Sequence, residues 1–156
     1  MNPLIFFQAF GIEKRRILGE YAKLCLGKDM GDSGYGDDVD CMISVYNVVF
    51  NATGIQLGDK ISTARAARSF RYNPRWREIQ IWKAEAGDIV ISPTQGDNTG
   101  HVGICGEFDI INKYPQEVYS NNSRTGLWDK HWGIGSWWNY FVYKKGLEMK
   151  VYRLIY

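Results

Sequence analysis

Three residue types that act together in nucleophilic catalysis occur in order along this chain. Cys41 follows an acidic, glycine-bearing stretch, His101 follows a polar loop, and Asn121 closes a short segment of strand-like composition. A thiol needs a neighbouring base such as imidazole to become a nucleophile. The imidazole in turn needs a polar acceptor, typically Asp, Asn or Glu, that fixes its tautomer. Cys41, His101 and Asn121 are therefore the candidate catalytic set.

Cys41 also has a simpler interpretation, as a buried cysteine that packs like a small hydrophobe. Asp37, Asp38 and Asp40 precede it closely, and their charge disfavours a second anion. Activation of the thiol would therefore depend on a histidine. Of the two histidines in the chain, His131 lies among tryptophans without a strand pattern, so His101 is the stronger candidate for the base.

Two adjacent asparagines compete for the third position, because Asn121 and Asn122 both lie at the end of the same predicted strand. Side chains alternate along a strand, so the two cannot both face the imidazole. One face carries Glu117, Tyr119 and Asn121, and the other carries Val118, Ser120 and Asn122. The second face begins with an apolar residue and resembles a packed side. We therefore expect Asn121 to orient His101.

The element that must position Cys41 is the apolar segment that follows it. Met42, Val45, Val49 and Ala52 recur at roughly helical spacing, and Gly54 suits the left-handed position beyond a helix end. We expect a buried helix with Cys41 in its first turn. There the helix dipole and free backbone N–H groups would favour the thiolate.

The remaining pattern predicts an α+β domain, with helices first and an antiparallel sheet of about five to six strands after them. A first helix is expected at about Glu13 to Leu26, and a short one at 62–68 is capped by Ser62 or Thr63. Strands are predicted at 89–91, 101–107 and 117–121, around Tyr140 to Tyr143, and at 150–155. We expect residues 1–156 to form a single domain.

Composition excludes several classes of protein. The chain has 156 residues, 45% of them hydrophobic and 15% aromatic, which is sufficient for a core. The basic and aromatic residues of 71–82 are of the types that can bind nucleic acid, but with a net charge of only +2 a solvated face is favoured and no nucleic acid is expected as a partner. No segment is apolar enough to predict a membrane span. Three cysteines, Cys25, Cys41 and Cys105, form no disulfide framework, and Cys25 is expected in the core.

Two further sites are possible on residue type alone. Four tryptophans lie between residues 127 and 138, and Trp128 and Trp132 are candidates to bind sugar rings, although packing of a long loop is slightly favoured. The acidic loop at 27–40 contains Asp32 and Asp37, whose carboxylates suit a Ca²⁺ ion, although a solvated loop is the simpler interpretation. We expect no required cofactor, with Ca²⁺ as a possible ligand.

Four segments resemble one known family. They are DDVDCMISVYNVVFNATGIQL, AEAGDIVISPT, GHVGICGE and EVYSNNS, and together they are similar to the papain-like cell-wall hydrolases, the CHAP and NlpC-like domains. In that family a cysteine opens a buried helix, a histidine begins a strand, and a third polar residue follows on the next strand. The chain departs from it at Met42-Ile43, where NlpC-like members usually have Ser-Gly, and in its Asn-Asn pair at 121–122.

The resemblance implies a papain-like fold and a peptidoglycan hydrolase that acts at the bacterial cell wall. Cys41 would be the nucleophile, His101 the base and Asn121 the orienting residue. The bond cleaved would be an amide, so the activity would be that of an N-acetylmuramoyl-L-alanine amidase or a peptide endopeptidase. Some phage lysins of this family bind calcium near the cysteine, which adds to the interest of Asp32.

Two expectations concern context. Leu4 to Phe10 is apolar but follows no basic residue, so no signal peptide is predicted, which would suit a phage lysin or a virion-carried enzyme. The alternative from another class is a non-catalytic papain-like module that binds the wall through its tryptophans, or a structural component of a virion.

Overall fold

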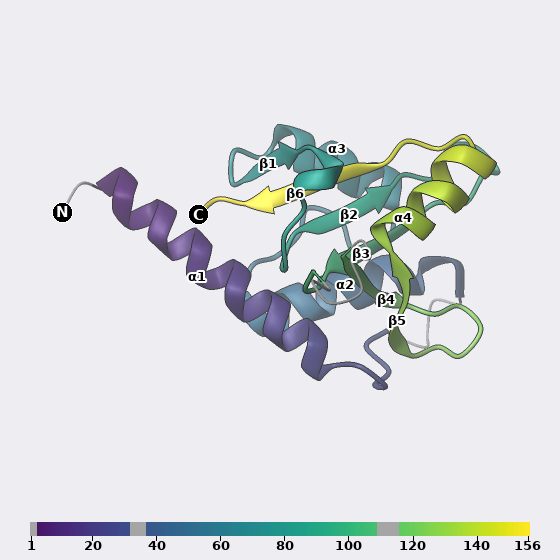
Figure 1. Ribbon diagram of the computed structural model, residues 1–156, viewed down its shortest axis with the longest axis horizontal. Coiled ribbons are helices and arrows are strands. Elements are labelled where there is room, and N and C mark those ends of the chain that lie inside the picture. Colours follow the sequence, from purple (N-terminus) through teal and green to yellow (C-terminus); the bar gives the residue numbers. More distant parts are fainter. Residues whose placement is uncertain (1–2, 32–36, 109–115) are drawn as a thin grey trace.

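The computed structural model describes residues 3–31, 37–108 and 116–156 of the chain (Figure 1). It consists of four α-helices packed on a six-stranded open antiparallel sheet, so the predicted α+β class is confirmed. The strand order is β1-β6-β2-β3-β4-β5. The strand bounds are β1 Trp76–Ile79, β2 Ile89–Ser92, β3 His101–Cys105, β4 Glu117–Asn121, β5 Trp128–Gly133 and β6 Lys150–Leu154.

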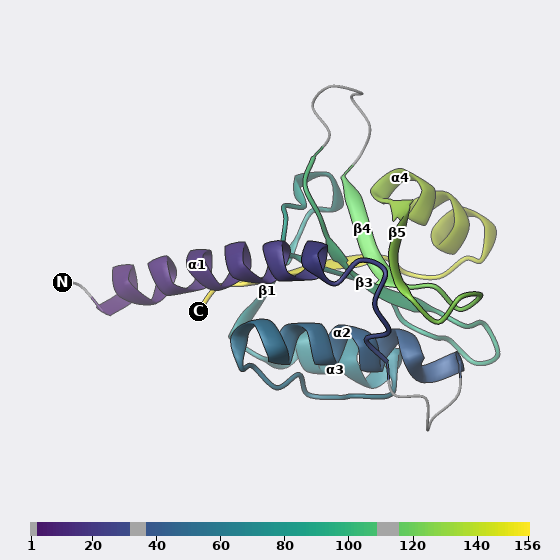
Figure 2. The same ribbon diagram turned by 90° about the horizontal axis from the view of Figure 1, so that it is seen from below.

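The helices divide between the two faces of this sheet. Helix α2 (Asp37–Thr53) and helix α3 (Thr63–Tyr72) lie on one side, and the short helix α4 (Ile134–Trp137) lies on the other (Figure 2). Helix α1 (Pro3–Leu24) is the longest and packs against α2. Neither α1 nor any other helix of the described residues is long and apolar enough to cross a membrane.

Two helices start differently from the sequence prediction. Helix α1 begins at Pro3 rather than near Glu13. Helix α2 begins at Asp37, so Cys41 lies in its second turn and the prediction of the first turn is wrong. Acidic residues are favoured in the first turn of a helix because they offset its positive end. Asp37, Asp38 and Asp40, which were assigned to a loop, therefore belong to α2. The predicted cap of α3 is confirmed, since Ser62 Oγ accepts a hydrogen bond from the Arg65 N–H.

The predicted strand at Tyr140 to Tyr143 is wrong, because these residues belong to a π-helical segment, η2 (Trp138–Lys144), that continues α4. Aromatic and β-branched residues favour strands only through the packing they find. Here Phe141 turns inward and its ring packs at 4.8 Å from that of Trp137. Two strands were missed, β1 and β5, and β5 includes Trp128 and Trp132 from the segment read as a loop.

A separate core covers each face of the sheet. The core on the α2 side includes Cys25 as predicted, together with Cys41, Met42, Val102 and Tyr119. The core on the α4 side is built from Val90, Cys105, Val118, Trp137 and Phe141. Both faces of the central strands are therefore buried. Every residue of β4 after Glu117 is buried, whichever side it faces.

Candidate active site

Cys41 reaches the sheet from α2. Its side chain is only 8% exposed and belongs to the core on the α2 side, next to the start of β3. Burial and, to a smaller extent, the Asp40 charge raise the pKa of the thiol to about 11. The backbone N–H groups of Met42, Cys41 and Val102 act in the opposite direction and favour the anion. The sulfur is therefore a neutral thiol at neutral pH.

His101 is the first residue of β3 and pairs with Ser92 of β2. Gly100 precedes it, and a Cβ at that position would lie 1.8 Å from the Ser92 carbonyl oxygen, so only glycine brings the chain into the strand this way. The imidazole stacks on Trp137, with ring centroids 5.2 Å apart and an interplanar angle of 24°. Trp137 is itself fixed, because its indole N–H donates to Ser92 Oγ at 2.9 Å.

The residue that holds His101 is Ser120. Its Oγ lies 3.0 Å from His101 Nε2, and its side chain is fully buried. In the β3–β4 register, Ile104 pairs with Tyr119 and Cys105 with Val118, which places Ser120 opposite Gly103 and on the face of His101. A Cβ at Gly103 would lie 3.2 Å from Ser120 Cβ and 2.7 Å from Val118. The missing side chain at 103 leaves room for this hydrogen bond.

Asn121, the predicted partner of His101, does not form this hydrogen bond. Because it follows Ser120 on the strand, it faces the α2 side instead. Asn121 is 3% exposed, and its Oδ1 has no hydrogen-bond partner in the part of the chain that the structure describes. Asn122 has a different role in the turn after β4, where its Nδ2 donates to Asp129 at 2.7 Å. Neither Asn121 nor Asn122 is hydrogen-bonded to the imidazole, so the residue that holds His101 is not one of the two candidates predicted from the sequence.

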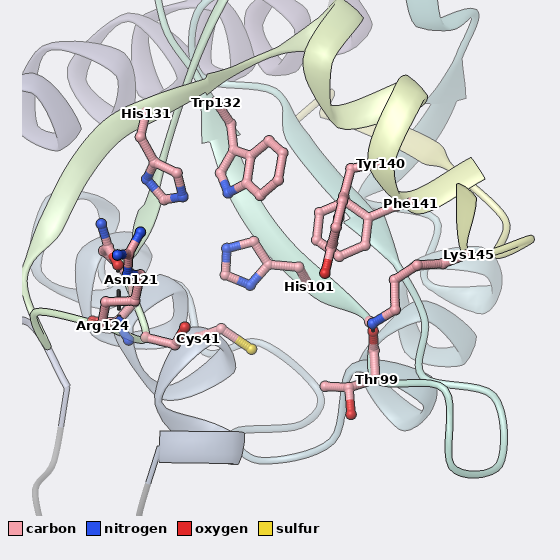
Figure 3. A pocket seen from close by; sticks show the side chains of 13 residues that line it. Cys41, Thr99, His101, Asn121, Arg124, His131, Trp132, Tyr140, Phe141 and Lys145 are labelled. Carbon is pink, nitrogen blue, oxygen red and sulfur yellow. Dashed lines mark hydrogen bonds between the residues drawn. The ribbon is translucent and has the colours of Figure 1, made fainter. Parts of the chain in front are cut away.

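Cys41, His101 and Asn121 nevertheless line one pocket, of about 560 Å³, at the end of the sheet where β3 begins and β4 ends. The lining also includes Arg124, His131, Trp132, Tyr140, Phe141 and Lys145. Figure 3 shows His101 in the middle of these side chains, with Cys41 beneath the imidazole and one ring nitrogen on the side towards Cys41. The sheet and α2 thus bring together a thiol and an imidazole that lie far apart in sequence.

The electrostatic environment keeps the imidazole neutral. Burial, with smaller contributions from the charges of His131 and Lys145, lowers the pKa of His101 to about 3, while the Asp129 charge acts in the opposite direction. An imidazole with so low a pKa is an acceptor for a proton at neutral pH. Since the Cys41 thiol is neutral as well, the two groups do not form a thiolate–imidazolium pair at neutral pH.

This environment predicts how stability depends on pH. The unfolded chain takes up a proton on His101 near pH 6.5, whereas the folded protein resists protonation until about pH 3. The contribution of His101 to the free energy of unfolding should therefore be fully present above about pH 6.5. It should fall as the pH drops towards 3, by at most about 1.4 kcal/mol per pH unit. Urea unfolding of wild type and His101→Gln between pH 7.5 and 4.5 measures the contribution. The variant should show the shallower slope, and parallel profiles would contradict the assignment.

The two tryptophans proposed to bind sugar rings are separated by the structure. Trp128 is fully buried in the core on the α2 side, and its indole N–H donates to the Ala22 carbonyl oxygen at 2.9 Å. The expectation that Trp128 contacts a ligand is therefore wrong, because its ring anchors β5 to α1. Trp132 does line the pocket, where its ring lies 5.4 Å from that of Tyr140.

The two candidate calcium ligands, Asp32 and Asp37, are described by the structure to different extents. Asp32 lies outside the described residues, and Asp37 is the first residue of α2, with a side chain that is also outside the described set. Within residues 3–31, 37–108 and 116–156, no group of three or more His, Cys, Asp and Glu side chains is arranged to hold a metal ion.

Sequence reasoning missed Ser120, the aromatic residues Tyr140 and Phe141 of η2, and Lys145 directly after η2. One pattern in the sequence could have indicated Ser120. It lies two residues before Asn122, on the strand face that was interpreted as the packed side. No pattern in the sequence indicated Tyr140, Phe141 or Lys145, because these residues were assigned to a predicted strand and the segment after it. Their place beside His101 follows from the return of η2 over the sheet (Figures 1 and 3).

Comparison with known proteins does not assign the chain to a family. No family model matches it, and no curated protein is found to be related to it. The resemblance to CHAP and NlpC-like domains stays a prediction, and the function has to be argued from the pocket.

Proposed function

We propose that this protein is a papain-like cysteine hydrolase that cleaves amide bonds of bacterial peptidoglycan. Cys41 is the nucleophile, His101 the general base and acid, and Ser120 the residue that positions His101. The observation that carries the proposal is that Cys41 from α2 and His101 from β3 line the same pocket, while the next strand supplies the hydrogen bond to the imidazole.

The hydrogen bond to Ser120 decides which nitrogen of His101 is free to act. Nε2 lies at Ser120 Oγ, which leaves Nδ1 for the thiol. A neutral imidazole has one donor nitrogen and one acceptor nitrogen. If Nε2 carries the proton and donates it to Ser120 Oγ, then Nδ1 is the acceptor that a base requires. Ser120 thus takes the part assigned to Asn121 from the sequence.

The pKa values favour proton transfer during attack rather than before it. With the Cys41 pKa at about 11 and the His101 pKa at about 3, transfer from thiol to imidazole is unfavourable in the empty pocket. The thiol proton therefore passes to Nδ1 as sulfur bonds to the amide carbon. The imidazolium then gives that proton to the leaving amine, and the C–N bond breaks to leave a thioester on Cys41.

Deacylation completes the cycle with the same two groups. His101 Nδ1 takes a proton from water, the resulting hydroxide attacks the thioester carbon, and the proton returns to the departing sulfur. Free carboxylic acid and the Cys41 thiol are the products. The backbone N–H groups near the sulfur, those of Met42, Cys41 and Val102, are candidate donors for the oxyanion of both tetrahedral intermediates.

Peptidoglycan as substrate rests on the motif resemblance, and the pocket is compatible with it. The pocket is open at the end of the sheet, and Trp132, Tyr140 and Phe141 form an aromatic wall beside the reacting groups. The deciding experiment is mass spectrometry of fragments released from purified sacculi by wild type and Cys41→Ala. Muropeptides that appear only with wild type support the proposal and identify the bond, either muramoyl–alanine or a peptide bond.

A second candidate, a non-catalytic module that binds the wall, is favoured by the neutral state of both Cys41 and His101. It predicts sedimentation of wild type with sacculi without release of any fragment. It also predicts that Cys41→Ala and wild type bind equally well. Hydrolysis by wild type at any rate above that of Cys41→Ala excludes it.

A further inference from the structure

We infer that the pocket selects substrates that carry a free carboxylate, and that Lys145 is the residue that binds it. This inference rests on the proposed amide hydrolysis, because the carboxylate is taken to belong to the peptide being cleaved. It concerns specificity, which neither the motifs nor the catalytic residues determine.

The charge of the pocket is the first argument. Among the described residues that line it there is no Asp or Glu, whereas Arg124, His131 and Lys145 all contribute to its wall. His131 is compensated, since it pairs with Asp129. Within the described residues, Arg124 and Lys145 form no salt bridge to any carboxylate, and Figure 3 shows them on opposite sides of Cys41 and His101.

Lys145 is held in place rather than free in solvent. Its Nζ donates to the Thr99 carbonyl oxygen at 2.6 Å and lies 5.6 Å from the centre of the Tyr140 ring. Its own carbonyl oxygen accepts from Asn98 Nδ2 at 2.5 Å, which ties the end of η2 to the loop before β3. The side chain is half-buried, and among the described residues only one of its three N–H donors is used in a hydrogen bond, the one to Thr99. A partly desolvated ammonium held beside a cavity gains from an anion there.

A polar residue on the other side of Cys41 and His101 indicates a peptide rather than a bare anion (Figure 3). Asn121 lines the pocket, and its buried Oδ1 has no hydrogen-bond partner among the described residues, so this acceptor is costly until a donor arrives. A peptide N–H supplies that donor. The acceptor Asn121 Oδ1 and the ammonium group of Lys145 lie on two sides of the Cys41 thiol (Figure 3). Together they suit a peptide segment that has a carboxylate close to the cleaved bond.

Occupation of Lys145 would also change the base. The Lys145 charge is one of the causes that lower the pKa of His101. A carboxylate on Lys145 offsets that charge and raises the affinity of the imidazole for a proton. Substrates with the carboxylate should therefore gain in kcat as well as in binding.

The test compares one muropeptide released from sacculi with the same muropeptide after its carboxylates are converted to primary amides. Wild type should cleave the carboxylate form with a kcat/KM about 10- to 100-fold higher than the amide form. Lys145→Met should bring that ratio close to one, and Lys145→Arg should keep most of it. Lys144→Met is the matched control, because Lys144 is the adjacent lysine, is exposed and does not line the pocket, so the wild-type ratio should persist.

A binding measurement separates this inference from the proposed hydrolysis. In the Cys41→Ala background, calorimetric titration with the two muropeptides should give tighter binding of the carboxylate form. Adding Lys145→Met should weaken the binding of that form about tenfold. That difference without turnover by wild type would refute hydrolysis and keep the carboxylate site. Turnover by wild type with equal rates for both forms, or an equal loss for both in Lys145→Met, would overturn the inference.

Discussion

Replacing Cys41 with alanine should abolish release of muropeptides, with a loss of at least about 10⁴-fold, because no other thiol lies in the pocket among the described residues. Although the side chain is nearly buried, the substitution removes only a single sulfur atom, so the fold should persist. Activity is measured as the initial rate of muropeptide release. Thermal unfolding followed by circular dichroism, with a change of only a few degrees, shows that the variant is folded.

The two other cysteines provide matched controls. Cys25 and Cys105 are also free and buried, so alanine at either position removes the same atom from a similar environment. Cys105 is the sharper control, because it lies four residues after His101 on the same face of β3. Both variants should keep most of the wild-type rate. Activity that survives in Cys41→Ala and disappears in Cys105→Ala would transfer the nucleophile to Cys105.

Replacing Ser120 with alanine should lower kcat by about 10²- to 10³-fold, on the scale of misplaced acid–base groups. The physical reason is the loss of the only hydrogen bond between Nε2 and the described residues, which leaves the tautomer and the ring orientation of His101 unfixed. KM should change little, because Ser120 does not line the pocket. Steady-state kinetics on one muropeptide measure the two parameters separately, and urea unfolding detects any general loss of stability.

Asn121→Ala is the natural comparison for Ser120→Ala. Asn121 lines the pocket, and its Oδ1 has no hydrogen-bond partner among the described residues, so its removal should raise KM more than it lowers kcat. The two adjacent residues should thus differ in the parameter they affect. A steep loss of kcat in Asn121→Ala with a normal kcat in Ser120→Ala would restore Asn121 as the residue that orients His101.

Much of the architecture could be predicted from the sequence. Helical spacing after Cys41, the cap at Ser62 and the polar loop before His101 are local signals, and the sequence pattern predicted the α+β class and the bounds of β4 to the residue. The same signals placed Cys41 on a helix and His101 at the start of a strand. Local patterns succeed here because spacing and capping act over a few residues.

Only the tertiary structure decided which side chain holds His101. Alternation along β4 divides its residues into two sets, but it does not say which set faces the imidazole. That choice usually follows from one face being polar, whereas here a core covers each side of the sheet, and Val118, Tyr119, Ser120 and Asn121 are all buried. The register with β3 and the absence of a side chain at Gly103 assign the position to Ser120.

The same limit applies to the rest of the pocket. Trp128 and Trp132 lie four residues apart on β5, yet the first is enclosed in the core beside α1 and the second lines the pocket. Lys145 reaches the pocket because α4 and η2 return over the face opposite α2. The sequence by itself determined the proposed reacting groups and the elements that carry them. The packing of distant elements around one end of the sheet determined how those groups are held and which charges surround them.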